Sequence, residues 1–234
     1  MQEETSKKKV LITGASRGIG RAVAELFDKK GYELILVCHK DVNDLKGLPG
    51  MHFAGDIGEY SFAERIGAEA GPVDVLVNNA GIACYALLQD TDPALFKKVI
   101  RTNLTSVYNT CRVFVPGMIK NHRGKIINIS SQWGNVGAAL ETAYSASKGG
   151  VNAFTKALAK ELAPSGIQVN AIACGVIDTD MNAVLNEEER NALVETIPAD
   201  RMGTPEDVAE MVLSLSESND YLTGQVIPFD GGWI

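Results

Sequence analysis

Residues 9–20 read KVLITGASRGIG, an apolar run that passes directly into a glycine-rich turn and then into a helical pattern. The glycines follow the spacing Gly-x-x-x-Gly-x-Gly. Gly14 permits a tight turn, Gly18 lets the backbone approach a pyrophosphate, and Gly20 lets the helix pack closely against a sheet. Backbone N–H groups at the start of a helix attract an anion, because the helix dipole adds to their charge. The stretch therefore predicts a dinucleotide-binding loop, and a glycine-rich turn without a ligand is the alternative.

Short runs of β-branched residues alternate with longer segments of helical periodicity along the chain. Parallel strands joined by right-handed helical crossovers form a sheet that is covered on both faces. We therefore expect an α/β protein, a single-domain doubly wound Rossmann fold over residues 9–234 with seven parallel strands and helices on both faces. Residues 1–8 are expected to form a flexible leader. Strands are expected at residues 9–13, 33–38, 51–54, 73–78, 125–130, 167–171 and 225–229, and helices at 20–30, 94–120, 142–163 and 205–216.

The composition narrows the class of protein. The chain has 234 residues, of which 45% are hydrophobic and 22% charged, as in an ordinary globular domain. Its net charge of −7 argues against a nucleic-acid-binding protein. We expect no signal peptide, and no apolar run approaches the roughly eighteen residues of a membrane helix. The four cysteines are too dispersed for a metal or redox motif, so we expect reduced thiols in a cytoplasmic protein without a metal site.

The end of the second expected strand bears on which dinucleotide binds. An enzyme that selects NAD usually has an acidic residue here, whereas one that selects NADP has a cation. Cys38 and His39 are not acidic, and Asp41 lies beyond the strand. Arg17, Lys40 and His39 could contact the extra phosphate of NADP, so NADP is favoured over NAD. A solvated turn is the alternative role for Lys40.

Asp56 follows the third expected strand, in the sequence Ala-Gly-Asp-Ile. A carboxylate in this place could accept a hydrogen bond from the adenine amino group. It could equally cap the helix that is expected to begin near Glu59.

Tyr144 and Lys148 lie four residues apart at the start of the expected helix 142–163, so they share one helix face. A Tyr-x-x-x-Lys pattern arises easily by chance, so other motifs in the sequence must show whether it is functional. Ser131 and residues 78–81 follow strands at the carboxyl edge of the sheet, where ligands bind. Asn103 lies inside an expected helix, an unusual place for a poor helix former unless its side chain bonds locally. Strand-end turns and a satisfied helix kink are the simpler explanations, but the whole set indicates a catalytic site.

These motifs resemble those of the short-chain dehydrogenase/reductase family, and the resemblance extends from Lys9 to Ile234. Three further segments are most similar to the β-ketoacyl-[acyl-carrier-protein] reductases of that family. The family motifs are TGASRGIG (13–20), NNAG (78–81), Asn103, Ser131 and Tyr144-x-x-x-Lys148, and the reductase-like segments are IACGVIDTDM (172–181), RMGTPEDVA (201–209) and LTGQVIPFDGG (222–232).

The resemblance implies a role for each catalytic residue. Tyr144 protonates the carbonyl oxygen of the substrate, and Ser131 donates a hydrogen bond to the same oxygen. Lys148, together with oxidised nicotinamide, lowers the pKa of the phenol from about 10 and also holds the ribose. Asn103 holds a water that links Lys148 to solvent. The cofactor-binding residues are expected to be Gly14, Ser16, Arg17, Gly18, Ile19, Gly20, His39, Lys40, Asp56, Ile57, Asn79, Ala80, Gly81, Tyr144, Lys148, Ile177 and Thr179.

The sequence departs from the family pattern at three places. Cys174 replaces the usual proline before Gly175, which makes the loop less rigid and places a thiol near the nicotinamide. Residues 82–85 replace a more usual Thr-Arg run. Ser165 stands where carrier-protein reductases often have arginine, although an acidic carrier needs cations beside the site. The candidate cations are Lys120, Arg123 and Lys160.

The predicted function is NADPH-dependent reduction of a 3-oxoacyl thioester to the 3-hydroxyacyl product, with acyl carrier protein as a candidate partner. The first alternative is a dehydrogenase or carbonyl reductase of a sugar, polyol or small ketone. The second is a cofactor-binding subunit without activity. The resemblance also implies a homotetramer built from the two long helices, 94–120 and 142–163, and the C-terminal edge strand.

Overall fold

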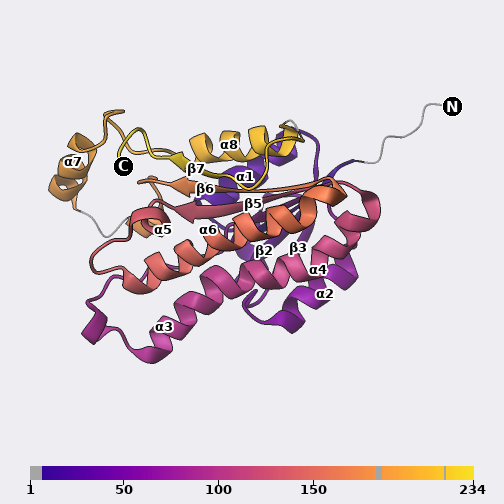
Figure 1. Ribbon diagram of the computed structural model, residues 1–234, viewed down its shortest axis with the longest axis horizontal. Helices are drawn as coiled ribbons and strands as arrows, with labels where there is room; N and C mark the ends of the chain where they lie inside the picture. The colour runs from indigo at the N-terminus through magenta and orange to yellow at the C-terminus, as the bar shows by residue number, and fades with distance from the viewer. Residues whose placement is uncertain (1–6, 183–185, 219) are drawn as a thin grey trace.

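The computed structural model describes residues 7–182, 186–218 and 220–234, so that residues 1–6 of the predicted leader lie outside it. Seven strands form one sheet in the order β3-β2-β1-β4-β5-β6-β7 (Figure 1). Every neighbouring pair is parallel. The strands are β1 (Lys9–Thr13), β2 (Glu33–Cys38), β3 (Met51–Ala54), β4 (Val75–Asn78), β5 (Gly124–Ser131), β6 (Ile167–Cys174) and β7 (Val226–Phe229).

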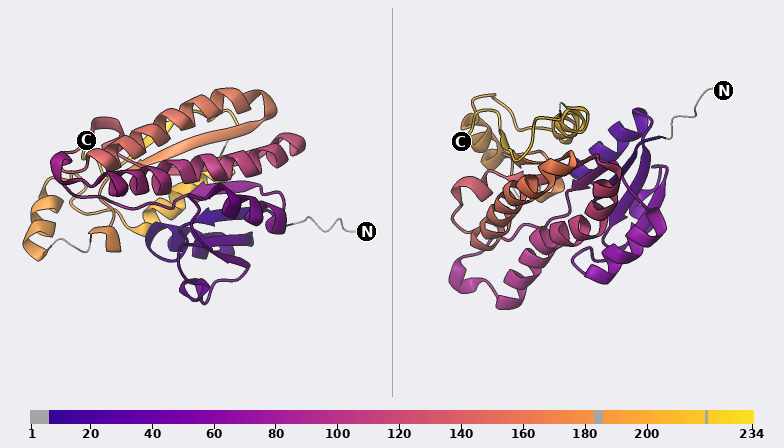
Figure 2. Two further views of the ribbon diagram at one scale, coloured as in Figure 1. Left: turned by 90° about the horizontal axis from the view of Figure 1, so that it is seen from below. Right: turned by 45° about the vertical axis from the view of Figure 1, so that its right-hand side comes forward.

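Helices cover both faces of the sheet, as predicted. On one face α1 and α8 pack together against Val10 and Ile12 of β1. On the other face α2, α4 and α6 pack against Leu11 of the same strand, and Figure 2 shows α6 beside the α3–α4 segment. The helices are α1 (Gly18–Lys29), α2 (Tyr60–Ala70), α3 (Pro93–Ile100), α4 (Ser106–Asn121), α5 (Trp133–Val136), α6 (Thr142–Leu162), α7 (Glu187–Glu195) and α8 (Pro205–Glu217), and the short 3-10 turns are η1 (Val42–Leu45), η2 (Leu88–Asp90), η4 (Ala163–Ser165) and η5 (Asp180–Asn182).

The order of the strands reverses between β1 and β4. From β1 the chain proceeds to β2 and β3 on one side, and from β4 it proceeds to β5, β6 and β7 on the other. A doubly wound sheet of this kind forms a crevice at the carboxyl ends of the strands where the order reverses. The glycine loop after β1 and the Asn-Asn-Ala-Gly motif after β4 both lie at this point.

The prediction of a single regular helix over residues 94–120 is wrong. The structure divides it into α3, a π-helical segment η3 (Arg101–Thr105) and α4, with Asn103 inside the π-helical segment. The side chain of Asn103 bonds outside its own helix, which explains why the regular hydrogen-bond ladder is interrupted there. Pro116 is accommodated within α4.

The other boundaries agree with the predictions to within a few residues. β4 begins at Val75 rather than at residue 73, and β5 and β6 are longer than predicted, ending at Ser131 and Cys174. Thr204 caps α8 and Pro205 is its first residue, as predicted. All four cysteines are buried free thiols. Within the described part of the chain, none of the helices combines the length and the apolar character needed to cross a bilayer.

Candidate active site

Three of the four predicted catalytic residues meet at the carboxyl end of β5. Ser131 is the last residue of β5, and Tyr144 and Lys148 lie in the first two turns of α6. Their exposed fractions are 8%, 9% and 5%. The side chains of Ser131 and Tyr144 are hydrogen-bonded, and Lys148 Nζ lies 5.7 Å from the centroid of the Tyr144 ring. The four-residue spacing therefore brings the phenol and the ammonium together, as the sequence predicts.

Burial controls the ionisation of this pair. It raises the pKa of Tyr144 well above its ordinary value of 10, and the hydrogen bond with Ser131 opposes this shift without cancelling it. Burial lowers the pKa of Lys148 to about 8, although the nearby thiol of Cys174 opposes that shift. The net shift of the Tyr144 pKa is upward because desolvation of the phenolate dominates, and the expectation that Lys148 together with oxidised nicotinamide lowers this pKa stays a prediction.

Asn103, the fourth predicted catalytic residue, is fixed by three hydrogen bonds. Its Oδ1 accepts from the backbone N–H of Ile82 at 2.8 Å, and its Nδ2 donates to the carbonyl of Ile82 and to Ser147 Oγ, both at 3.0 Å. It also lies beside Lys148, because a Cβ on Gly81 would be 3.5 Å from Asn103 Oδ1 and 3.6 Å from Lys148 Nζ. The π-helical segment thus brings Asn103 to the catalytic residues, and its predicted role in holding a water stays a prediction.

The glycine loop is tied to the Asn-Asn-Ala-Gly motif. Asn79 Nδ2 donates to the carbonyls of Thr13 and Gly14, at 3.0 and 3.1 Å. The backbone N–H groups of Asn79 and Ala80 both donate to Thr13 Oγ1 at 3.0 Å. A Cβ on Gly20 would lie only 2.2 Å from the carbonyl oxygen of Gly14, so no larger residue fits there. Asn79 therefore shapes the loop that is predicted to hold the cofactor.

The residues after β1 fit the pyrophosphate of a dinucleotide. Arg17 is the N-cap residue of α1, but its side chain makes no capping hydrogen bond, and the first turn of α1 contains no acidic residue. The N–H groups at this end are therefore available to an anion from outside the chain. Ser16 lies in the loop before α1, and Ile19 lies in the first turn of that helix. Gly18 faces Thr179, whose Cγ2 would lie 3.3 Å from a Cβ on the glycine. The loop after β6 thus borders the predicted cofactor site.

The groups predicted to bind the adenosine end differ in their surroundings. His39 and Lys40 are exposed after β2. Arg17 forms an exposed ion pair of 3.6 Å with Asp180, which the sequence did not indicate.

The carboxylate of Asp56 accepts from the N–H of Gly58 at 2.8 Å and pairs with Arg101 at 2.7 Å. It is not the cap of α2, because the N-cap residue is Glu59 and the N–H that the Asp56 carboxylate accepts from, that of Gly58, lies before the helix. The neighbouring Ile57 is buried, as is Ile177 in the loop after β6.

Glu141 is a site residue that the sequence analysis missed. It is the N-cap residue of α6, three positions before Tyr144. Burial raises the pKa of its carboxyl, which is hydrogen-bonded to Trp133, and its charge helps to raise the pKa of Tyr144. Its position one helical turn before the predicted acid was a signal for this contact.

Comparisons with known proteins identify the family to which the chain belongs. The family model for short chain dehydrogenases matches residues 8–190. The 3-oxoacyl-[acyl-carrier-protein] reductase FabG of Vibrio harveyi is 38% identical, over 96% of both chains. The crystal structure of a 3-oxoacyl-[acyl-carrier protein] reductase from Brucella melitensis has a TM-score of 0.90 at 33% identity, covering 97% of this chain and 91% of that one. A provisionally assigned gluconate dehydrogenase from Agrobacterium tumefaciens also has a TM-score of 0.90, at 35% identity, with coverage of 97% and 95%.

The matched family model spans most of the chain, and the relatives are oxidoreductases that align over nearly their full length. The glycine loop and the Ser-Tyr-Lys cluster described above lie within the matched residues 8–190. The chain therefore belongs to the short-chain dehydrogenase family and is an oxidoreductase that uses NAD(P).

Proposed function

We propose that this protein uses NADPH to reduce a 3-oxoacyl thioester to the 3-hydroxyacyl product. The observation that carries the proposal is the meeting of Ser131, Tyr144 and Lys148 at the carboxyl edge of the sheet, beside the glycine loop. The carrier-protein reductases among the relatives favour the thioester over other carbonyl compounds.

The ionisation of the site suits reduction. Because burial keeps the pKa of Tyr144 high, its phenol is protonated at neutral pH and can act as the acid. Ser131 Oγ donates a hydrogen bond to the carbonyl oxygen, and the proton of Tyr144 Oη moves to the same oxygen. Lys148 Nζ, in its cationic form, stabilises the phenolate that remains. NADPH, when bound, supplies the hydride that reduces the carbonyl carbon.

Charge at the end of β2 supports NADPH over NADH. The exposed His39 and Lys40 form no hydrogen bond or ion pair within the described part of the chain, so both are available to an added phosphate. Arg17 can join them once its weak, exposed pair with Asp180 opens. Lys40→Glu is expected to weaken NADPH binding at least tenfold and to leave NADH binding nearly unchanged. Equal effects on the two dinucleotides in a binding titration would contradict the assignment.

The surface near Ser165 limits how a carrier protein could dock. Arg123 is paired with Asp74 at 2.7 Å. Lys125 Nζ donates to the carbonyl of Ser218 at 3.0 Å and to the carboxylate of Asp220 at 2.9 Å. Of the predicted cations, Lys120 and Lys160 therefore remain for an acidic carrier, since both are exposed and neither forms an ion pair within residues 7–182, 186–218 and 220–234. Both lie in the last turns of their helices, α4 and α6, whereas Tyr144 lies in the first turn of α6, so within one chain they are not beside the catalytic residues.

A second candidate function is reduction of a small polar ketone or a sugar-derived carbonyl. The observation that favours it is Glu141, whose carboxylate beside Tyr144 could accept hydrogen bonds from substrate hydroxyls. The similarity to a provisionally assigned gluconate dehydrogenase points in the same direction.

A substrate panel separates the two functions. Oxidation of NADPH is followed with acetoacetyl-coenzyme A, an acetoacetyl-carrier protein, keto-sugar acids and small ketones, and each reaction is repeated with NADH. We expect the two thioesters to give the highest kcat/KM, with NADPH preferred. No turnover of either thioester, together with efficient turnover of a keto-sugar acid, would replace the first function with the second.

A further inference from the structure

A continuous row of side-chain hydrogen bonds passes behind the catalytic residues, from β5 to the C-terminal segment. Ser130 Oγ donates to Asn152 Oδ1 at 2.5 Å, and Asn152 Nδ2 donates to Asn135 Oδ1 at 2.8 Å. Asn135 Nδ2 donates to Gln132 Oε1 at 2.8 Å, and Gln132 Nε2 donates to the carboxylate of Asp230. We refer to these five residues as the amide row.

Every bond in the amide row has the same direction. Each side chain accepts from the member before it and donates to the next, and the last acceptor is a carboxylate. Hydrogen bonds arranged head to tail polarise one another, and a bond to an ionised acceptor is the strongest type. The carboxylate of Asp230 also accepts from the backbone N–H groups of Gly232 and Ile234, at 3.0 and 3.3 Å. The row is therefore anchored in the last residues of the chain.

The amide row contains no catalytic residue, but some of its members are direct neighbours of the catalytic residues. Ser131 lies between Ser130 and Gln132 in the sequence, and Asn152 is one helical turn after Lys148. The turn that carries Gln132 packs tightly on α6, since a Cβ on Gly134 would lie 2.7 Å from the backbone carbon of Lys148. A shift of the row would therefore change the position of Ser131 relative to α6.

The C-terminal segment makes further contacts with the same turn. The rings of Trp133 and Trp233 lie with their centroids 5.0 Å apart. Trp233 Nε1 donates to Thr196 Oγ1 at 2.9 Å, and the N–H of Ala199 donates to the carbonyl of Gly231 at 3.1 Å. The segment thus joins the turn after β5 to the chain that follows α7.

We propose that Gln132, Asn152 and Asp230 are positioning residues, which fix Ser131 of β5 against Tyr144 and Lys148 of α6 and make the C-terminal segment part of the assembly of the active site. The effect on rate rests on the proposed carbonyl reduction, whereas the effect on local structure does not. A small displacement of reacting groups lowers the rate strongly, whereas dinucleotide binding at the glycine loop does not depend on the row.

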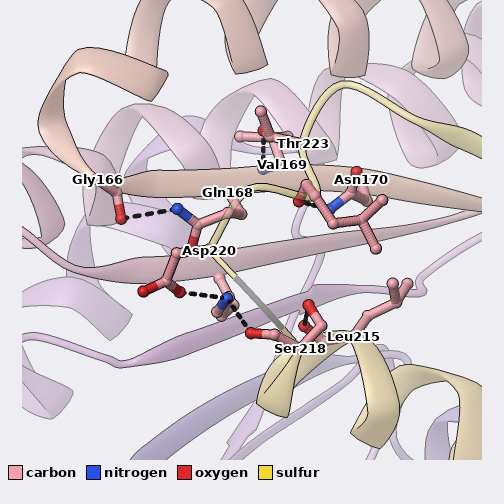
Figure 3. Close-up of polar contacts among 10 residues, drawn as sticks. Gly166, Gln168, Val169, Asn170, Leu215, Ser218, Asp220 and Thr223 are labelled. Atoms are coloured by element: carbon pink, nitrogen blue, oxygen red, sulfur yellow. Dashed lines mark hydrogen bonds and ion pairs between the residues drawn. The ribbon is translucent and has the colours of Figure 1, made fainter.

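The test compares two buried glutamines that are matched in exposure. Gln132 is 3% exposed and belongs to the row. Gln168 is 4% exposed, lies at the start of β6 and donates to the carbonyl of Gly166 just before that strand (Figure 3), at the opposite end of β6 from Cys174. Gln132→Met and Gln168→Met each replace the amide with a side chain of similar volume. We expect Gln132→Met to lower kcat about tenfold with little change in the KM for NADPH. We expect Gln168→Met to keep the kcat of the parent.

A second pair of variants covers the case in which Gln132→Met does not fold. Asp230→Asn keeps an acceptor for Gln132 and is expected to retain kcat to within about threefold, whereas Asp230→Ala removes it and is expected to lose about tenfold. Hydrogen exchange of residues 131–136 is measured for all four variants, because it requires no substrate. We expect faster exchange there in Gln132→Met and Asp230→Ala than in their matched controls.

The outcomes are distinct. Equal kcat values for the two glutamine variants, or for the two aspartate variants, would overturn the proposal. If the parent turns over no carbonyl substrate, the proposed function has failed, and the exchange of residues 131–136 alone decides the inference. Faster exchange in Gln132→Met than in Gln168→Met then supports the row, and equal exchange overturns it.

Discussion

The side chains of Tyr144 and Lys148 are almost fully buried, and each has a pKa shifted toward its neutral form. A buried phenol holds its proton, which is what a general acid requires before it acts. A buried ammonium loses its proton readily, so Lys148 is the member of the pair that changes its charge first as the pH rises. The two residues therefore have separate, measurable roles.

Those roles predict different effects on dinucleotide binding. Tyr144→Phe removes one hydroxyl and is expected to leave the dissociation constant for NADPH within about twofold of the parent. Lys148→Ala removes the group expected to hold the ribose and is expected to weaken binding by about tenfold or more. A fluorescence titration of each variant with NADPH tests this, and equal losses in the two variants would contradict the assignment.

The lowered pKa of Lys148 predicts a pH limit on reduction. The pKa of Tyr144 is raised, so the phenol stays protonated through neutral and mildly alkaline pH. The pKa of Lys148 is about 8 because of burial, so its charge disappears as the pH rises through that value. We expect kcat/KM for reduction, which reports groups of the free enzyme, to fall above pH of about 8. A profile that stays flat to about pH 10 would exclude this role for Lys148.

At the scale of single elements, the N-terminus of α8 is stabilised by a capping box. Thr204 Oγ1 accepts from the N–H of Asp207, and the carboxylate of Asp207 accepts from the N–H of Thr204 at 2.8 Å. Asp207 also pairs with Arg201 at 2.6 Å. These contacts, with the Arg201 hydrogen bond as the largest, lower the pKa of Asp207 to about 2 from its ordinary 3.8.

The cap predicts a pH-dependent stability. A lowered carboxyl pKa means that the stabilisation is fully present above about pH 4 and is lost as the pH falls toward about 2. Asp207→Ala is expected to lower the free energy of unfolding by about 1–2 kcal/mol at pH 7, and the difference from the parent shrinks below pH 4. Glu206→Gln is the control, because Glu206 has no ion pair within the described residues. Urea unfolding at several pH values measures both variants, and a pH-independent difference would refute the linkage.

The elements also show where prediction from sequence fails. The strands and the caps follow from local patterns, such as Thr204-Pro205 before α8, and these predictions are confirmed. The π-helical segment Arg101–Thr105 has no such pattern, because it depends on Asn103 bonding to Ile82, which is 21 positions away. A contact between distant residues cannot be identified from helical periodicity alone.

At the scale of the whole molecule, apolar side chains remain exposed on the α3–α4 face. Tyr108 is 50% exposed, and Phe96 and Ile119 are 42% and 40% exposed. The edge strand β7 pairs with β6 on one side and with no other described strand. Exposed apolar faces and open strand edges favour association. We propose the homotetramer that the family resemblance implies, with α4, α6 and β7 at its interfaces.

Association predicts a definite mass in solution. Light scattering of the parent is expected to give the mass of four chains of 25.0 kDa. Tyr108→Glu places a charge on the exposed face and is expected to produce smaller species. A light-scattering mass equal to that of one chain would contradict the proposed assembly.

The site shows the same division between local pattern and distant contact. The glycine loop and the Tyr144–Lys148 spacing could be predicted, because each lies within a few residues of sequence. The amide row could not, since it joins Ser130 of β5 to Asp230 by way of α6 and α5. The ion pairs of Arg17 and Arg123 with Asp180 and Asp74 were missed for the same reason.

The central claim is that the phenol of Tyr144 supplies the proton for reduction of a carbonyl group. The direct test is the initial rate of NADPH oxidation by acetoacetyl-coenzyme A, measured for the parent and for Tyr144→Phe at saturating NADPH. The account predicts steady turnover by the parent and a loss of about a hundredfold or more in the variant, with the fold unchanged by circular dichroism. A Tyr144→Phe variant that reduces the thioester as fast as the parent would contradict it.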